Sequence, residues 1–256
     1  MADEEKKVYE DKREHVTPES HRLPKKSSKK IGIIAAVVAI VAMAGIGFWQ
    51  WHETPGFCAA ICHNMDEYLY TYNEQQGVGG VDKYGNAVSN TNAMMATLHR
   101  QNNTTAMSEI GCMGCHHAVI GEQVSEGVGW MLGSYKYPLD ERVGDALTHW
   151  WGEPGTVFCS NENCHAYLLG NDNLVSMDKL SDSTRWMDFN PHAQEHENLN
   201  LACTDCHQGH RASVYVCAGC HDEIELPSGW ITYQESEELM AAQFNGNAQG
   251  FVGSMT

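Results

Sequence analysis

One long uncharged segment stands out in the pattern of hydrophobic and polar positions. Residues 31–51 (IGIIAAVVAIVAMAGIGFWQW) are 21 residues without a charge. As a helix they would be about 31 Å long, close to the hydrocarbon thickness of a bilayer. The residues that follow contain few long periodic apolar runs and many Gly, Asn, Asp and Ser. The pattern predicts a mainly α-helical protein with one N-terminal transmembrane helix, extensive loops and little or no sheet. A further short helix is expected at Glu235–Phe244.

The residues that flank this segment predict its orientation. Four lysines precede it, at positions 25, 26, 29 and 30, and Trp49 and Trp51 close it. Positive charge favours the cytoplasmic side, so the long C-terminal part should lie outside the cytoplasm, on the periplasmic or cell-surface side of the cell membrane. The alternative is a cleaved signal peptide with Ala42-Met43-Ala44 at its cleavage site. The long polar leader favours a retained single-pass anchor.

We therefore predict four parts of the chain. Residues 1–30 are a polar cytoplasmic leader, 31–51 the anchor, 52–226 a compact domain and 227–256 a C-terminal tail. The leader holds nine Lys/Arg and seven Asp/Glu, which leaves 7 basic and 26 acidic residues outside. Such an acidic surface repels nucleic acid and attracts a basic protein partner. A solvated coat that keeps the protein soluble explains the same charge.

All ten cysteines occur in five close pairs, and a histidine follows the second cysteine of every pair. Three pairs fit the pattern C-x-x-C-H, and the other two have one and two additional residues between the cysteines. In chain order, the five motifs are Cys58/Cys62/His63, Cys112/Cys115/His116, Cys159/Cys164/His165, Cys203/Cys206/His207 and Cys217/Cys220/His221. We number them sites 1 to 5.

This spacing is the attachment signal of c-type haem. Two thiols bond the two vinyl groups of one haem, and the adjacent histidine is then held beneath the iron as an axial ligand. Zinc sites and disulfides do not require a histidine after each second cysteine. The sequence therefore predicts five covalently bound haems in residues 52–226. Their faces would supply the apolar surface that a side-chain core otherwise provides.

The remaining histidines supply candidate sixth ligands for the iron atoms: His99, His117, His149, His192, His196 and His210. His117 cannot bind the same iron as its neighbour His116. It serves another haem or contacts a propionate. His192 and His196 are four residues apart and would share one face of a helix. At site 1, Met65 follows His63 closely, so that its thioether could replace the histidine as ligand.

These residues resemble the NapC/NirT/NrfH family of membrane-anchored multihaem quinol dehydrogenases, over roughly residues 31–210. The resemblance consists of the anchor followed at once by a haem motif, the C-H-x-M sequence at His63 to Met65, the segment LHRQN with His99, and CTDCHQGH with His210. It implies that Met65 binds the first haem in place of His63. It also implies that this haem is open to a quinol, and that His99 serves a later haem, the third.

The chain also departs from the family pattern. It has a fifth motif, two lengthened motifs and a Gly/Asn-rich insertion at residues 77–92. The basic residues expected soon after the second motif are missing, so quinol-site candidates are the nearest ionisable residues, Glu122, Glu126, Lys136 and Asp140.

The leading hypothesis is electron transfer from a membrane quinol, menaquinol, to an extracytoplasmic reductase or other redox protein. A quinol releases protons with its electrons, so the site needs a proton acceptor. An alternative is an anchored relay subunit of a larger respiratory complex with no quinol site of its own. A multihaem nitrite reductase is disfavoured, because all five motifs end in histidine and none carries the lysine of that catalytic haem.

Overall fold

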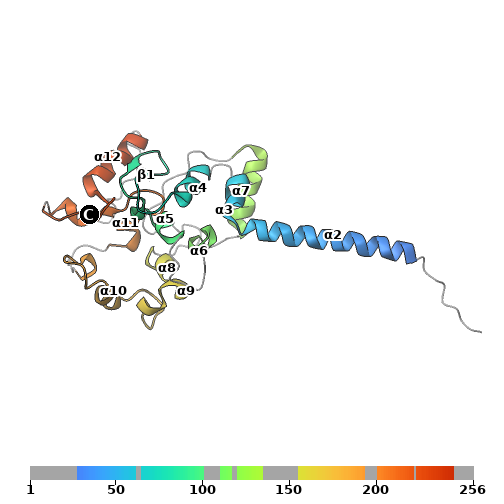
Figure 1. Cartoon of the computed structure of the whole chain (residues 1–256), viewed down its shortest axis with the longest axis horizontal. Coiled ribbons are helices and arrows are strands. Elements are labelled where there is room, and N and C mark those ends of the chain that lie inside the picture. The colour runs from blue at the N-terminus through green and yellow to red at the C-terminus, as the bar shows by residue number, and fades with distance from the viewer. Residues whose placement is uncertain are drawn as a thin grey trace, which may run out of the picture. The chain divides into compact units, whose positions relative to one another are not determined.

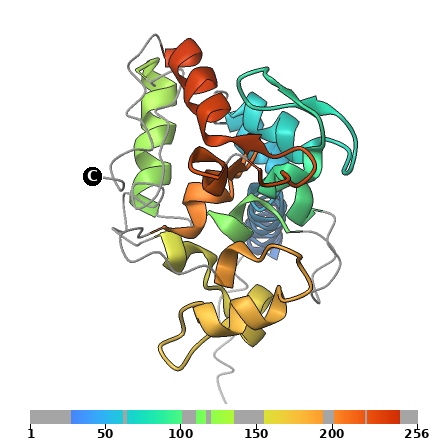
Figure 2. The same ribbon diagram turned by 90° about the vertical axis from the view of Figure 1, so that its left-hand side faces the viewer.

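The computed structural model describes residues 28–61, 65–100, 110–116, 120–134, 155–193, 201–221 and 223–244. These residues form mostly short helices joined by long loops, with four strands of two residues each (Figures 1 and 2). The chain divides after Trp49 into two compact units. The predicted mainly α-helical class with little sheet is confirmed.

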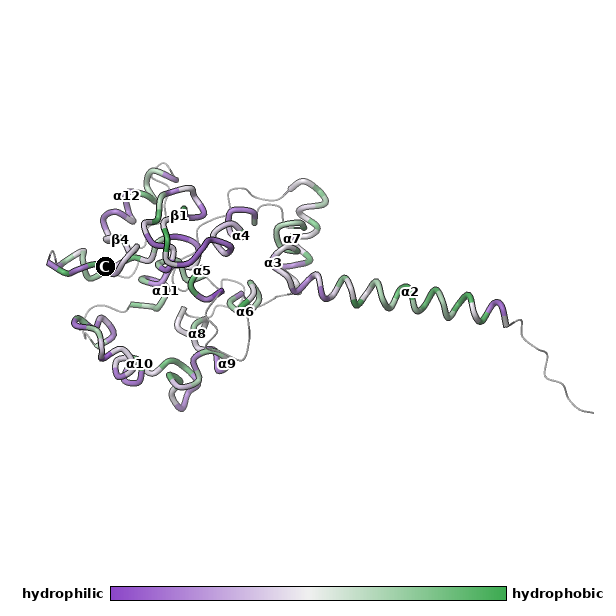
Figure 3. Tube along the Cα trace, viewed as in Figure 1, coloured by the Kyte–Doolittle hydropathy of each residue, from purple (hydrophilic) through white to green (hydrophobic). Residues whose placement is uncertain are grey.

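The first unit contains most of helix α2 (Ser28–His52). At 1.5 Å per residue its 25 residues are about 37 Å long. Its apolar positions continue around the helix, and Figure 3 shows apolar colouring along most of its length, with hydrophilic colouring at both ends. Among the described residues it is the one helix long and apolar enough to cross a membrane. A signal sequence has the same properties.

The second unit contains the remaining elements. Its α-helices are α3 (Pro55–Ile61), α4 (Asp66–Asn73), α5 (Met95–Arg100), α6 (Cys112–Cys115), α7 (Ile120–Leu132), α8 (Gly155–Cys159), α9 (Glu162–His165), α10 (Met177–Ser183), α11 (Cys203–Cys206) and α12 (Tyr233–Phe244). The 3₁₀ turns are η1 (Thr91–Ala93), η3 (Ala166–Leu168), η4 (Pro191–Ala193) and η5 (Val216–Gly219). The strands are β1 (Gly80–Val81), β2 (Ala87–Val88), β3 (Val214–Tyr215) and β4 (Ile231–Thr232).

The side-chain core of this unit is small. Val88, Ala93, Met94 and Ala212 form its buried cluster, with Trp230 and Ile231 packed against it. β3 pairs with β4 in parallel, so α12, which follows β4 directly, is joined to the segment just before site 5. The segment predicted as a C-terminal tail therefore includes a strand and a helix that pack on the domain.

The insertion at residues 77–92 forms a hairpin that supports the histidine segment after site 4. Buried Asp82 accepts hydrogen bonds from the amides of Tyr84 and Asn86, and Gly85 takes the positive φ of 83° that the turn requires. The amide of Lys83 then donates to the carbonyl of His210 at 2.9 Å. The insertion thus fixes the backbone of a candidate ligand.

Candidate haem-binding cavity

Three of the five motifs are single helical turns. In each of them the histidine amide donates to the carbonyl of the first cysteine, which closes the turn and brings both thiols and the imidazole together. The bonds are His116 to Cys112 (2.8 Å), His207 to Cys203 (2.9 Å) and His221 to Cys217 (3.0 Å). The C-x-x-C-H spacing therefore sets the local geometry at sites 2, 4 and 5.

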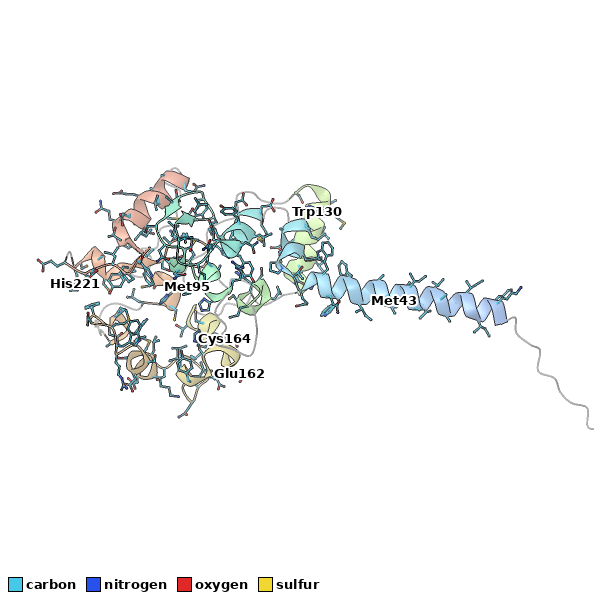
Figure 4. All side chains as sticks on the ribbon, viewed as in Figure 1. Met43, Met95, Trp130, Glu162, Cys164 and His221 are labelled. Carbon is cyan, nitrogen blue, oxygen red and sulfur yellow. The ribbon has the colours of Figure 1, made fainter. Side chains whose placement is uncertain are left out.

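The lengthened motif of site 3 reaches a similar turn by a different route. Cys159 ends α8, Cys164 lies in α9, and the His165 amide donates to the Asn161 carbonyl at 2.8 Å. The additional residues form the link between these two helices. In Figure 4, Cys164 and Glu162 mark α9. A longer loop between the cysteines is therefore compatible with a closed turn at the histidine.

One cavity of about 2030 Å³ in the second unit collects the predicted ligands. It is larger than the 300–1,000 Å³ or so of a pocket for one small ligand. Its walls include the nine described cysteines of the motifs, all of which are free thiols. They also include every described candidate for binding iron, namely Met65, His99, His116, His165, His192, His207, His210 and His221. Glu126 lines it as well.

Cysteines of successive motifs approach one another inside this cavity. A hydrogen bond between the thiols of Cys58 and Cys112 raises the pKa of Cys58 and lowers that of Cys112. A hydrogen bond with Cys159 lowers the pKa of the Cys203 thiol to about 7. Electrostatic contacts join the other neighbours, Cys115 with Cys164 and Cys206 with Cys217. Sites 1 to 5 therefore form one row in chain order.

Six histidines face one another in three pairs across the cavity. An imidazole nitrogen bonds a transition metal at about 2 Å and lies about 1.1 Å from its ring centre, so two imidazoles on opposite sides of one iron have ring centres about 6.2 Å apart. The observed separations are 6.3 Å for His99–His165, 6.4 Å for His116–His210 and 6.2 Å for His192–His207. Each pair joins one motif histidine to one candidate sixth ligand.

Hydrogen bonds orient the three candidate sixth ligands. The Nδ1 atom of His99 lies 2.8 Å from the Met95 carbonyl, which can only accept, so Nδ1 carries the proton and Nε2 keeps its lone pair. Thr71 Oγ1 donates to the Tyr68 carbonyl and accepts from His210 Nδ1 at 2.7 Å. Thr184 Oγ1 and His192 Nδ1 are 3.3 Å apart. Such bonds from the second nitrogen are typical of histidines that bind metals.

Burial keeps several of these imidazoles neutral. It lowers the pKa of His210 to about 3, with smaller contributions from His116 and Lys83. Burial likewise lowers the pKa of His207 to about 4, with the charges of His192 and His99 adding to it. The neutral form is the one that binds a metal.

The donor set fits haem better than an isolated metal ion. No three His, Cys, Asp or Glu side chains among the described residues converge as zinc would require. Paired histidines suffice for haem iron, because the porphyrin supplies its other four ligands. Nδ1 of His165 and of His207 is buried and has no hydrogen-bond partner among the residues that the structure describes. Residues and cavity therefore fit several haems.

Other predicted site residues lie outside the described part of the chain. They are Cys62, His63, His117, Lys136, Asp140, His149 and His196, and for Glu122 only the main chain in α7 is described. His63 and Met65 therefore both remain candidate iron ligands at site 1. His192 lies in η4.

The sequence did not indicate which groups hold the candidate ligands. Thr71, Thr184 and the Met95 carbonyl orient them, and the Trp230 ring packs edge-on against His207 at 5.2 Å. Thr71 is 139 residues from His210 in the chain. Only the spacing of Met95 and His99, four residues apart on α5, offered a local signal.

Comparison with known proteins agrees with this chemistry. Residues 159–222 match the family described as cytochrome c3. The chain is 46% identical to the cytochrome c-type protein Cgr1 of Eggerthella lenta over 211 aligned residues. These residues are 82% of this chain and 90% of that protein. No solved structure matches the chain.

The fold, the cavity and these similarities define a multihaem c-type cytochrome, whose haem iron is covalently bound and whose function is electron transfer. Such a protein exchanges electrons with a redox partner. Within that class, the chain belongs to the family of cytochrome c-type proteins that includes Cgr1.

Proposed function

We propose that this cytochrome carries five haems, remains anchored in the membrane and transfers electrons from a quinol, menaquinol, to an extracytoplasmic reductase or other redox protein. The observation that carries the electron-transfer role is the set of three histidine pairs at 6.2 to 6.4 Å. Two imidazoles that bind one haem iron would leave no place on it for a substrate, which favours electron transfer. The NapC/NirT/NrfH resemblance is the basis for the quinol.

The histidine pairs assign residues to three of the five haems. At site 2, Cys112 and Cys115 attach the haem, and His116 and His210 bind its iron. At site 3, Cys159 and Cys164 attach it, with His165 and His99 as ligands. At site 4, Cys203 and Cys206 attach it, with His207 and His192. When bound, each haem supplies one-electron chemistry, and the chain supplies placement and ligation.

Sites 1 and 5 complete the row. Cys58 and Cys62 would attach the first haem, with Met65 or His63 as an iron ligand, and quinol would deliver its electrons to this haem. Cys217, Cys220 and His221 hold the fifth haem, for which His117, His149 and His196 remain candidate sixth ligands. The contacts between successive motif cysteines support a continuous path from site 1 to site 5.

Glu126 is the proton acceptor that we propose for quinol oxidation. It lines the cavity, and its charge contributes to the raised pKa of the Cys58 thiol, so it lies near site 1. Quinol oxidation releases two protons, and a carboxylate beside the ring can accept them one at a time and pass each to water. Glu122, Lys136 and Asp140 remain further candidates.

Full-length oxidised protein mixed with a menaquinol analogue should show reduced haem in its absorbance spectrum. We expect Glu126→Gln to slow this reduction by about 10²-fold or more, because a positioned base contributes 10²–10⁴-fold. Reduction by dithionite should not change. Glu162→Gln is the matched control, because this exposed α9 glutamate does not line the cavity.

Haems that stay oxidised with quinol, although dithionite reduces them, would contradict quinol oxidation. That outcome would favour the alternative function, an anchored relay within a larger complex. The relay predicts co-purification with a stable membrane partner and no response to quinol alone.

A further inference from the structure

The insertion at residues 77–92 brings a lysine close to His210, the candidate sixth ligand of site 2. Lys83 is half-buried, lines the haem cavity and donates its amide hydrogen to the His210 carbonyl at 2.9 Å. The Glu74 carboxylate, just after α4, accepts from the Val81 amide at 3.1 Å, so that the hairpin and α4 lie side by side (Figure 2). The main chain of the insertion is therefore held both at α4 and at His210.

Two tyrosine rings fix the position of the Lys83 ammonium group. Nζ lies 4.9 Å from the ring centre of Tyr68 and 5.0 Å from that of Tyr84, distances typical of a cation over an aromatic face. The Tyr68 ring also packs edge-on against the His210 imidazole, with 5.0 Å between the ring centres. Nζ of Lys83 therefore lies within about 10 Å of the His210 ring centre.

A fixed cation at this distance favours the reduced state of a haem that His210 binds. Ferric haem carries one more positive charge than ferrous haem, and a nearby positive charge disfavours the more positive state. At an effective dielectric constant of about 20, a unit charge at about 10 Å changes an equilibrium constant on the order of tenfold. The effect is large enough to measure at a single haem.

Two other charged residues lie next to Lys83 and His210 in the chain. The Asp82 carboxylate accepts hydrogen bonds from two main-chain amides and from the Asn86 side chain, and it does not line the cavity. Arg211 is buried and lines the cavity, so its guanidinium adds to the positive charge around the ligand. Lys83 is the cation that the insertion contributes, and its side chain can be changed while the amide that bonds His210 is kept.

We propose that Lys83 sets the reduction potential of the haem at site 2, because its ammonium group favours the ferrous state. Two imidazole ligands stabilise ferric iron, and the cation offsets part of that effect. Site 2 then accepts electrons from site 1 more readily than its two histidines alone would allow. The insertion, which departs from the NapC/NirT/NrfH pattern, thereby has a role in electron transfer. The inference rests on the proposed ligation of site 2 by His116 and His210.

A reductive titration of the full haem-loaded chain tests this inference, with His210→Ala as the background that identifies site 2. In that background the site 2 iron loses one axial ligand and adds a high-spin signal to the absorbance spectrum, whereas the haems at sites 3 and 4 stay low-spin. We expect Lys83→Gln to lower the equilibrium constant for reduction of the high-spin haem by about tenfold, a shift of about 59 mV for one electron. The low-spin haems should shift less.

Two matched variants separate the charge of Lys83 from its packing. Lys83→Arg keeps the positive charge and should leave the potential of the high-spin haem unchanged. Lys179→Gln removes the charge of an exposed lysine that bonds the Leu169 carbonyl and lies outside the cavity walls. It should leave that potential unchanged as well.

An unchanged potential of the high-spin haem in Lys83→Gln would overturn the inference and leave the ligation of site 2 intact. An equal fall in Lys83→Arg would overturn it by indicating packing, and an equal fall in Lys179→Gln by indicating net charge alone. A larger shift of a low-spin haem would assign the effect of Lys83 to another site and contradict the inference. Without an additional high-spin signal in His210→Ala, the proposed ligation of site 2 would fail, and this inference with it.

Discussion

Replacing His210 with alanine is expected to convert one haem from the low-spin to the high-spin state. His210 is half-buried, and its ring centre lies 6.4 Å from that of His116, with 16° between the ring planes. Loss of this imidazole leaves one axial position of the site 2 iron open. Because the imidazole stabilises ferric iron, the midpoint potential of that haem should rise by about 0.1 V, within the roughly 0.8 V that axial ligands span. Absorbance and electron paramagnetic resonance spectra measure the spin state.

Two further measurements separate ligation from packing. His210→Met should keep the haem low-spin at a raised potential, because methionine is an alternative ligand. Added imidazole should restore the low-spin spectrum of His210→Ala. His52→Ala is the control, because the His52 ring packs against Phe57 at 4.8 Å and belongs to none of the three histidine pairs. An unchanged low-spin spectrum in His210→Ala would contradict the proposed ligation of site 2.

Replacing both cysteines of site 3, Cys159→Ala with Cys164→Ala, is expected to interrupt the row of sites. Site 3 connects site 2 to site 4 through the contacts of Cys115 with Cys164 and of Cys159 with Cys203. The protein should lose the mass of one haem. Quinol should then reduce the haems at sites 1 and 2, whereas those at sites 4 and 5 stay oxidised on the same timescale. Dithionite should reduce all remaining haems. Stopped-flow absorbance measures both reactions.

The same change at the end of the row provides the control. Cys217→Ala with Cys220→Ala also removes one haem, but it leaves sites 1 to 4 adjacent. Quinol should therefore reduce every haem that remains in this variant. Equal extents and rates of reduction in the two variants would show that electrons do not follow the order of the sites.

The sequence predicted those structural features that depend on interactions between residues close to one another in the chain. The uncharged run of residues 31–51 predicted a helix that extends from Ser28 to His52 in the structure, and Glu235–Phe244 lies within α12. The C-x-x-C-H spacing predicted where thiols and imidazoles come together, because one helical turn joins them. These features need no knowledge of distant contacts.

Long-range contacts explain what the sequence could not supply. His116 and His210 are far apart in the chain, and no local sequence pattern around either of them indicates that they pair. The hairpin at residues 77–92, which the sequence showed only as a Gly/Asn-rich insertion, holds the His210 backbone through Lys83.

The central claim is that ten cysteines hold five haems, and intact mass spectrometry of the purified chain under denaturing conditions tests it most directly. Thioether bonds survive denaturation, whereas non-covalent cofactors dissociate. The account predicts the mass of the polypeptide plus five haems, with no free thiol available to alkylating reagents. A mass with fewer haems and a matching number of free or disulfide-bonded cysteines would contradict it.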